Sequence, residues 1–148
     1  MGDVVLKMEG IDKSFPGVHA LNKARFELRA GEVHALVGEN GAGKSTLMKI
    51  LAGIYAKDAG VILYQGKEAE IPNPRAAQHL GISMIHQELN LMPHLSLAQN
   101  VFVGREPRGG LPFMLDEKKI NAQTQALFDL MHLRLNPRTK AADLTVAK

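Results

Sequence analysis

Apolar residues toward the start of the chain form short runs separated by glycine-rich or polar bends. Runs of this length predict β-strands, here at residues 4–8, 26–28, 34–37, 61–64 and 82–86. The run at 34–37 is mostly apolar, which is typical of a buried central strand. A tight turn is predicted at Gln65-Gly66-Lys67, and Phe15-Pro16-Gly17 predicts a bend between the first two strands.

Segments with helical spacing of apolar residues lie between these predicted strands. From Gly43 onward, apolar residues recur at the positions expected for one helix face, namely Leu47, Ile50 and Leu51. Gly53 follows and predicts the end of this helix, because glycine favours the left-handed conformation found there. Pro74 predicts the first turn of another short helix. The order is therefore a β-rich start followed by β-loop-α and α-β units.

The last third of the chain changes character. Residues 97–103 predict one or two helical turns, and residues 104–112, which hold three Gly and two Pro, predict a loop. Asp116 predicts the N-cap of a helix that runs to about His132, and Pro137 ends the region. The positions expected to share one face of this helix are Ile120, Thr124, Leu127 and Met131. A mixed α/β front is thus followed by a mainly helical back part.

Composition narrows the class of protein. The chain has 148 residues, no Cys and no Trp, and 45% of its residues are hydrophobic. This length suggests one domain with a core, and no apolar run approaches the roughly eighteen residues of a membrane span. Zero Cys excludes disulfide scaffolds and thiolate metal sites and fits a cytosolic protein. The formal charge of +3 comes without a block of Lys and Arg, so charge does not imply a nucleic acid partner.

The residues that carry chemistry follow the predicted strand at 34–37. Gly38-Glu39-Asn40-Gly41-Ala42-Gly43-Lys44-Ser45 satisfies the phosphate-binding pattern G-x-x-x-x-G-K-[ST]. Glycines let the backbone turn several N–H groups toward one anion, and the helix that follows directs its free N–H groups at a β-phosphate. Lys44 adds a charge near the β- and γ-phosphates. The Ser45 hydroxyl is a suitable Mg²⁺ ligand, and Thr46 is the weaker candidate.

This pattern is specific in its context. A random chain of this length would contain it in about one case in a few hundred, and here an apolar run precedes it and a helical pattern follows. A simple glycine-rich turn is the weaker interpretation. The dinucleotide fingerprint G-x-G-x-x-G does not match, because the glycines are spaced G-x-x-G-x-G. A phosphate-binding loop does not by itself distinguish kinases, GTPases and motor ATPases.

Three stretches resemble one family within this class, the ATP-binding subunits of ABC transporters, and most of all those of bacterial monosaccharide importers such as the ribose and galactose systems. The stretches are residues 11–21, residues 37–55 (VGENGAGKSTLMKILAGIY) and residues 81–106 (GISMIHQELNLMPHLSLAQNVFVGRE). The resemblance covers essentially the whole chain. It implies an α/β fold, with a P-loop NTPase core and antiparallel β subdomain in residues 1–87. The Q-loop and the start of a helical subdomain would occupy residues 88–148.

The same resemblance implies roles for individual residues. Phe15 is similar to the aromatic residue that stacks on adenine, and residues 38–46 would bind the phosphates. Gln87 is similar to the Q-loop glutamine that contacts Mg²⁺ and the attacking water, so Ser45 and Gln87 are the expected Mg²⁺ ligands. From the residues alone, Phe15 is equally well explained as a small-core residue, and an isolated Gln is more often a surface residue.

Other chemistry-bearing residues are not assigned to the site. His86 and His94 belong to a set of six scattered His without Cys or an H-E-x-x-H pattern, which favours core or loop positions over a metal site. Asp58 follows the P-loop helix rather than an apolar strand, so it is not predicted to be a magnesium carboxylate. The methionines are interpreted as packing residues.

The resemblance also implies sequence motifs that residues 1–148 do not contain. In the family, a signature motif, a Walker B strand ending in Asp-Glu and a switch histidine follow the Q-loop, and hydrolysis needs them. Residues 144–148 resemble the opening of the signature motif. We therefore expect an incomplete domain, the front of a longer protein with a second ATPase half, that binds ATP weakly without turnover.

The resemblance places the parent protein at the cytoplasmic face of the inner membrane, bound to transmembrane permease subunits and served by a periplasmic sugar-binding protein. No nucleic acid partner is expected. Two alternatives stay open. One is a non-transport ABC ATPase, which would carry a basic surface or an inserted arm. The other is a fragment without useful nucleotide affinity, because a parallel sheet lacking strands exposes strand edges and apolar faces.

Overall fold

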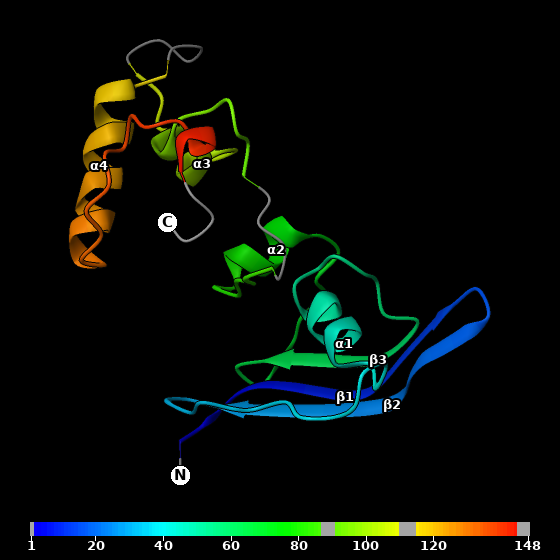
Figure 1. The fold of residues 1–148 in the computed structure, drawn as a ribbon. Coiled ribbons are helices and arrows are strands. Elements are labelled where there is room, and N and C mark those ends of the chain that lie inside the picture. Colours follow the sequence, from blue (N-terminus) through cyan, green and yellow to red (C-terminus); the bar gives the residue numbers. More distant parts are fainter. Residues whose placement is uncertain (1, 87–90, 110–114, 145–148) are drawn as a thin grey trace. The chain divides into compact units, whose positions relative to one another are not determined.

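The chain folds into two compact units, one that ends at Ile85 and one that begins at His86. The computed structural model describes residues 2–86, 91–109 and 115–144. Figure 1 shows the sheet in the first unit and mostly helices in the second. Across the described residues, no helix is both long and apolar enough to cross a membrane.

An antiparallel sheet organises the first unit. Strands β1 (Val4–Phe15) and β2 (Val18–Arg29) form a long hairpin, and β3 (Ala59–Tyr64) pairs with the other edge of β1. The short strand β4 (Lys67–Glu68) completes the order β2-β1-β3-β4. The predicted strands at the start of the chain are thus real but much longer, because hairpin pairing continues through polar positions that an apolar run does not mark.

The turn between β3 and β4 was predicted correctly. Gln65 and Gly66 have φ angles of 50° and 76°, so both central residues are left-handed. Two such residues in a two-residue loop match the twist of the strands they connect. Glycine meets this requirement without steric cost, and the turn fixes the register that pairs Tyr64 with Lys67.

Helix α1 (Lys44–Leu51) lies on one face of this sheet (Figure 1). Its buried residues are Leu47, Ile50 and Leu51, the positions that the helical spacing predicts. They join a cluster that includes Leu6, Met8, Ile11, Leu21 and Ile62 from the sheet. Helix α2 (Pro74–His79) adds Ala77 to the cluster, and the Asn73 side chain caps it by accepting from the Ala76 N–H at 3.0 Å. The core of the first unit therefore lies between the sheet and these helices.

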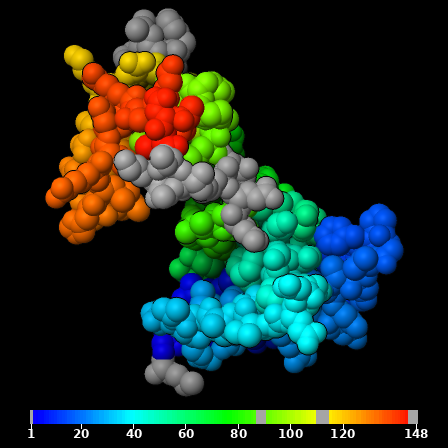
Figure 2. Space-filling model, in the orientation of Figure 1, coloured from blue at the N-terminus to red at the C-terminus, as the bar shows by residue number. Residues whose placement is uncertain are grey.

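Two predicted strands are wrong. Residues 34–37 and 82–86 form no strand, and the side chains of Val37 and Ile85 are 87% and 98% exposed. In Figure 2 the cyan segment around residue 40 lies at the surface. A strand needs a neighbour that supplies its hydrogen bonds, and within the described ranges neither run pairs with one. An apolar run predicts burial but does not specify the partner that achieves it.

The second unit contains helices α3 (Leu97–Phe102) and α4 (Glu117–Leu130) and one 3-10 turn, η1 (Ala141–Asp143). Asp116 caps α4 as predicted, accepting from the Lys119 N–H at 3.0 Å. The segment before η1 runs beside the start of α3. There, the Leu97 and Ala98 N–H groups donate to the carbonyls of Thr139 and Pro137 at 2.8 and 2.9 Å.

The buried face of α4 differs from the predicted one. Ile120 and Thr124 are buried as expected, but the third buried position is Phe128, whereas Leu127 and Met131 are exposed. Positions seven and eight residues apart lie on nearly the same side of a helix, so spacing alone does not decide between Leu127 and Phe128. The larger aromatic side chain lies on the buried side.

The core position of Leu6 provides a stability test. Leu6 is 3% exposed, so Leu6→Ala should lower the free energy of unfolding of the first unit by about 3 kcal/mol, through lost burial and the cavity left behind. Leu130→Ala is the matched control, since Leu130 is 76% exposed and lies in the second unit. Both tyrosines of the chain, Tyr55 and Tyr64, lie in the first unit, so tyrosine fluorescence during urea unfolding reports on that unit. Equal losses in the two variants would contradict the assigned core.

Candidate functional site

A surface pocket of about 450 Å³ in the first unit is lined by residues of the predicted phosphate-binding loop and by the predicted aromatic residue. Its walls come from the end of β1, the start of β2 and the segment that leads into α1. The lining residues are Phe15, Val18, His19, Ala20, and residues 40–46. The pocket thus brings together residues that lie far apart in the sequence.

The loop conformation depends on two glycines. Gly41 and Gly43 have φ angles of 86° and 83°, which L side chains rarely adopt. At Gly43 the space is also restricted, because a Cβ atom would lie 2.6 Å from the Ala20 carbonyl oxygen. Gly43 therefore allows the first turn of α1 to approach the start of β2.

The N-terminus of α1 opens into this pocket. Gly43 is its N-cap, no side chain caps it, and its first turn holds no acidic residue. The first N–H groups of a helix have no partner within the helix, and they carry the positive end of the helix dipole. This arrangement is suited to an anion at residues 43–46.

Lys44 adds a full positive charge at the same place. Its Nζ atom donates to the carbonyl oxygens of Gly38 and Glu39 at 2.5 and 2.8 Å. The loop is closed further by the Ala42 N–H, which donates to the Glu39 carbonyl at 3.2 Å. The ammonium is therefore held against the loop backbone, on a residue that lines the pocket.

Phe15 ends β1 and is half-buried. Its ring contacts Tyr55 edge-on, with centroids 5.2 Å apart and an interplanar angle of 70°. Lys13 Nζ lies 5.5 Å from the Phe15 ring centroid. The ring thus packs within the first unit and also lines the pocket, so the two interpretations of Phe15 from the sequence are compatible.

Asp58 is the residue near this site that sequence reasoning missed. Its carboxylate accepts from Lys13 Nζ and from the Ser14 N–H, both at 2.7 Å. The Lys13 ammonium, and after it the Ser14 N–H, hold the pKa of the Asp58 carboxyl below its ordinary value of 3.8. No local motif marks this role, because the partners lie more than forty residues away in the sequence.

Of the two predicted Mg²⁺ ligands, Ser45 and Gln87, the structure describes Ser45. The Ser45 hydroxyl is on a residue that lines the pocket, and oxygen is the ligand type that Mg²⁺ prefers. Gln87, the other predicted ligand, lies outside the described residues. Within the described ranges no group of three or more His, Asp or Glu is placed to hold a metal, His86 and His94 included.

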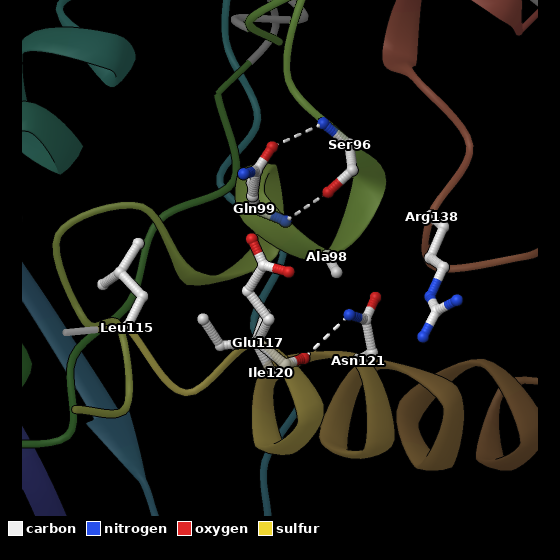
Figure 3. A pocket seen from close by; sticks show the side chains of 8 residues that line it. All are labelled: Ser96, Ala98, Gln99, Leu115, Glu117, Ile120, Asn121 and Arg138. Carbon is white, nitrogen blue, oxygen red and sulfur yellow. Dashed lines mark hydrogen bonds between the residues drawn. The ribbon is translucent and has the colours of Figure 1, made fainter. Parts of the chain in front are cut away.

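A second, smaller pocket of about 180 Å³ lies in the second unit (Figure 3). Ser96 and Gln99 form a reciprocal capping pair at its edge, with hydrogen bonds of 2.9 and 3.1 Å. Asn121 Nδ2 donates to the Glu117 carbonyl at 2.7 Å. None of the predicted site residues that the structure describes lines this pocket.

The antiparallel sheet, helix α1 and the G-x-x-x-x-G-K-[ST] sequence of residues 38–45 are those of the α/β P-loop class of proteins. Within that class, the family model described as ABC transporter matches residues 21–146, and the chain belongs to this family.

Relatives and solved structures agree with this assignment. The chain is 62% identical, over 97% of its length, to a ribose/galactose/methyl galactoside import ATP-binding protein of Burkholderia cenocepacia (strain HI2424), and 48% identical to one of Agrobacterium fabrum (strain C58 / ATCC 33970). It spans 28% of the length of each of these relatives. A nucleotide-free ATP-binding cassette from an ABC transporter has the same fold, with a TM-score of 0.80 at 23% identity over 97% of this chain and 60% of that one.

The two loop glycines provide a matched pair of variants. Gly43→Ala should destabilise the first unit by about 2–3 kcal/mol more than Gly41→Ala. Both variants replace a glycine with positive φ, but only at Gly43 would the added Cβ atom also clash with the Ala20 carbonyl. At Gly41 a Cβ atom would meet nothing within 4 Å. Urea unfolding, monitored by tyrosine fluorescence, measures the free energy of unfolding of both variants. Equal destabilisation would show that the close approach at Gly43 is not required.

The Asp58 contacts predict a specific acid response. Because the folded pKa is lowered, the contacts stabilise the fold above pH 3.8 and are lost as the pH falls through the folded pKa. The difference in thermal midpoint between the natural protein and Asp58→Ala should therefore be largest at neutral pH and shrink below pH 3.8. Glu70→Gln, which removes the exposed ion pair of 3.2 Å with Lys57, is the control. A difference that stays constant across this range would contradict the pairing of Asp58.

Proposed function

We propose that the pocket in the first unit binds ATP, and that the chain is part of the energy-coupling ATPase of a sugar importer. The observation that carries the proposal is the single pocket that unites Lys44, the uncapped start of α1 and Phe15. A nucleoside triphosphate has an anionic end and a flat aromatic end. This pocket offers a matching group to each of them.

Each part of the nucleotide has a partner of suitable chemistry. The N–H groups of residues 43–46 and the Lys44 ammonium receive the phosphates, and charge-assisted hydrogen bonds of this kind are the stronger ones. Phe15 stacks on the adenine, which contributes about 1–3 kcal/mol for a base on an aromatic ring. Ser45 holds Mg²⁺, with Gln87 as its proposed second protein ligand. When bound, the ion would neutralise part of the charge of the phosphates.

Sugar import is proposed from the relatives. The Burkholderia cenocepacia and Agrobacterium fabrum proteins are named as ribose/galactose/methyl galactoside import ATP-binding proteins. We propose for the whole protein a place at the cytoplasmic face of the inner membrane, with permease subunits, a periplasmic sugar-binding protein and a second ATPase half. For residues 1–148 alone we propose weak ATP binding without turnover, with the Q-loop and the start of the helical subdomain in residues 88–148.

Lys44 provides the test of nucleotide binding. Lys44→Ala should weaken MgATP binding, measured by isothermal titration calorimetry, by at least about tenfold, because hydrogen bonds to charged groups contribute about 1.5–3 kcal/mol. Lys67→Ala removes the same charge from β4, outside the pocket, and should leave the affinity unchanged. Unaltered affinity in Lys44→Ala would contradict the proposed phosphate site.

Two further measurements test the rest of the proposal. Steady phosphate release from the 148-residue chain that Lys44→Ala abolishes would contradict the absence of turnover. Gel filtration alongside the titration separates weak binding by a monomer from loss of binding through self-association, since Val37 and Ile85 expose apolar surface.

A further inference from the structure

The loop between α1 and β3 is joined to the end of β1 at three consecutive residues. The Asp58 carboxylate accepts from Lys13 Nζ and the Ser14 N–H, each at 2.7 Å, and the Asp58 N–H donates to the Asp12 carbonyl at 2.9 Å. Phe15 is the next residue along the chain. Asp58 therefore fixes the backbone immediately before the aromatic ring that lines the pocket.

These contacts lie beyond the last paired residue of the neighbouring strand. Pairing between β1 and β3 runs from Leu6 with Tyr64 to Asp12 with Ala59 and ends there. In Figure 1 the tip of the β1–β2 hairpin extends past the end of β3. The Asp58 side chain bonds a backbone N–H in this extension, and it thereby continues the support that β3 gives to the rest of β1.

The side chain of Phe15 is held through the same network. Lys13 Nζ, which is bound to Asp58, lies 5.5 Å from the Phe15 ring centroid. Tyr55 contacts the same ring edge-on, and Lys49 Nζ lies 5.4 Å from the Tyr55 ring centroid. A cation near an aromatic ring is attracted by its quadrupole. The position of the ring thus depends on Asp58 through both the backbone at Ser14 and the ammonium of Lys13.

We infer that Asp58 is a positioning residue for base recognition, which holds Phe15 at the pocket so that the ring can stack on a purine. This inference rests on the proposed binding of ATP. Asp58 does not line the pocket, so it contacts neither the base nor the phosphates. Its effect should therefore depend on the presence of a base in the ligand, which distinguishes it from the effect of Lys44.

The test compares two ligands, MgATP and inorganic tripolyphosphate with Mg²⁺. Asp58→Ala should weaken MgATP binding about three- to tenfold, a part of the contribution that base stacking makes, and should change tripolyphosphate binding less than about twofold. Asp58→Asn keeps an acceptor for the Ser14 N–H, so it should restore part of the affinity. Glu70→Gln is the matched control, because it breaks a Lys–carboxylate pair away from the pocket.

A double-variant cycle identifies the route of the effect. In a Phe15→Ala background, Asp58→Ala should cause no further loss of MgATP affinity, because there is no ring left to position. An equal loss with and without Phe15 would overturn the inference. The same conclusion would follow if Asp58→Ala weakened tripolyphosphate binding as much as MgATP binding, since the variant would then disturb the whole pocket.

A spectroscopic measurement tests the position of the ring without nucleotide. The chain contains no Trp, so Phe15→Trp introduces a single indole reporter. Adding Asp58→Ala should lower its fluorescence anisotropy, and unchanged anisotropy would overturn the inference. If the natural protein binds MgATP in a Lys44-dependent way while Asp58→Ala binds it equally well, this inference fails and the proposed function stands. If the natural protein does not bind MgATP, both fail.

Discussion

The close approach between Gly43 and the start of β2 governs the arrangement of the first unit. At this point a Cβ atom would lie 2.6 Å from the Ala20 carbonyl and from the Leu21 side chain. Because glycine allows the contact, α1 begins directly against the sheet and buries Leu47, Ile50 and Leu51 in the core. The same contact directs the uncapped N-terminus of α1 into the pocket. The packing of α1 and the proposed anion site therefore have one structural origin.

The two ends of the pocket differ in how the sequence encodes them. The proposed phosphate end is lined by consecutive residues, 40–46, so a local sequence pattern is enough to mark them as a candidate. At the proposed base end, Phe15 lines the pocket, Tyr55 after α1 contacts its ring, and Asp58 before β3 bonds the residues just before it. These contacts join residues forty or more positions apart, and their formation depends on the pairing of β1 with β3. Sequence reasoning located Phe15 only through family resemblance, and it did not recognise Asp58.

The same distinction explains which elements were predictable. Helix α1, the turn at Gln65-Gly66 and the cap at Asp116 follow from short-range spacing and backbone preference, and the structure contains all of them. The runs at 34–37 and 82–86 have the composition of buried strands, but a strand exists only when another segment pairs with it. Likewise, α4 was located correctly, yet Phe128 rather than Leu127 is buried, because tertiary packing selects between neighbouring positions of one face.

Within the described ranges, residues 34–37 pair with no strand, and Lys44 holds the chain that follows them. Residues 37–39 lead from this segment into the loop. In the part of the chain that the structure describes, Lys44 Nζ holds them by side-chain hydrogen bonds to the Gly38 and Glu39 carbonyls. Phosphate oxygens would compete with those carbonyls for the same ammonium. Since Lys44 has three donor hydrogens, it can satisfy a phosphate and one carbonyl together. The proposed anion binding would therefore be coupled, through the Lys44 side chain, to the anchoring of Gly38 and Glu39.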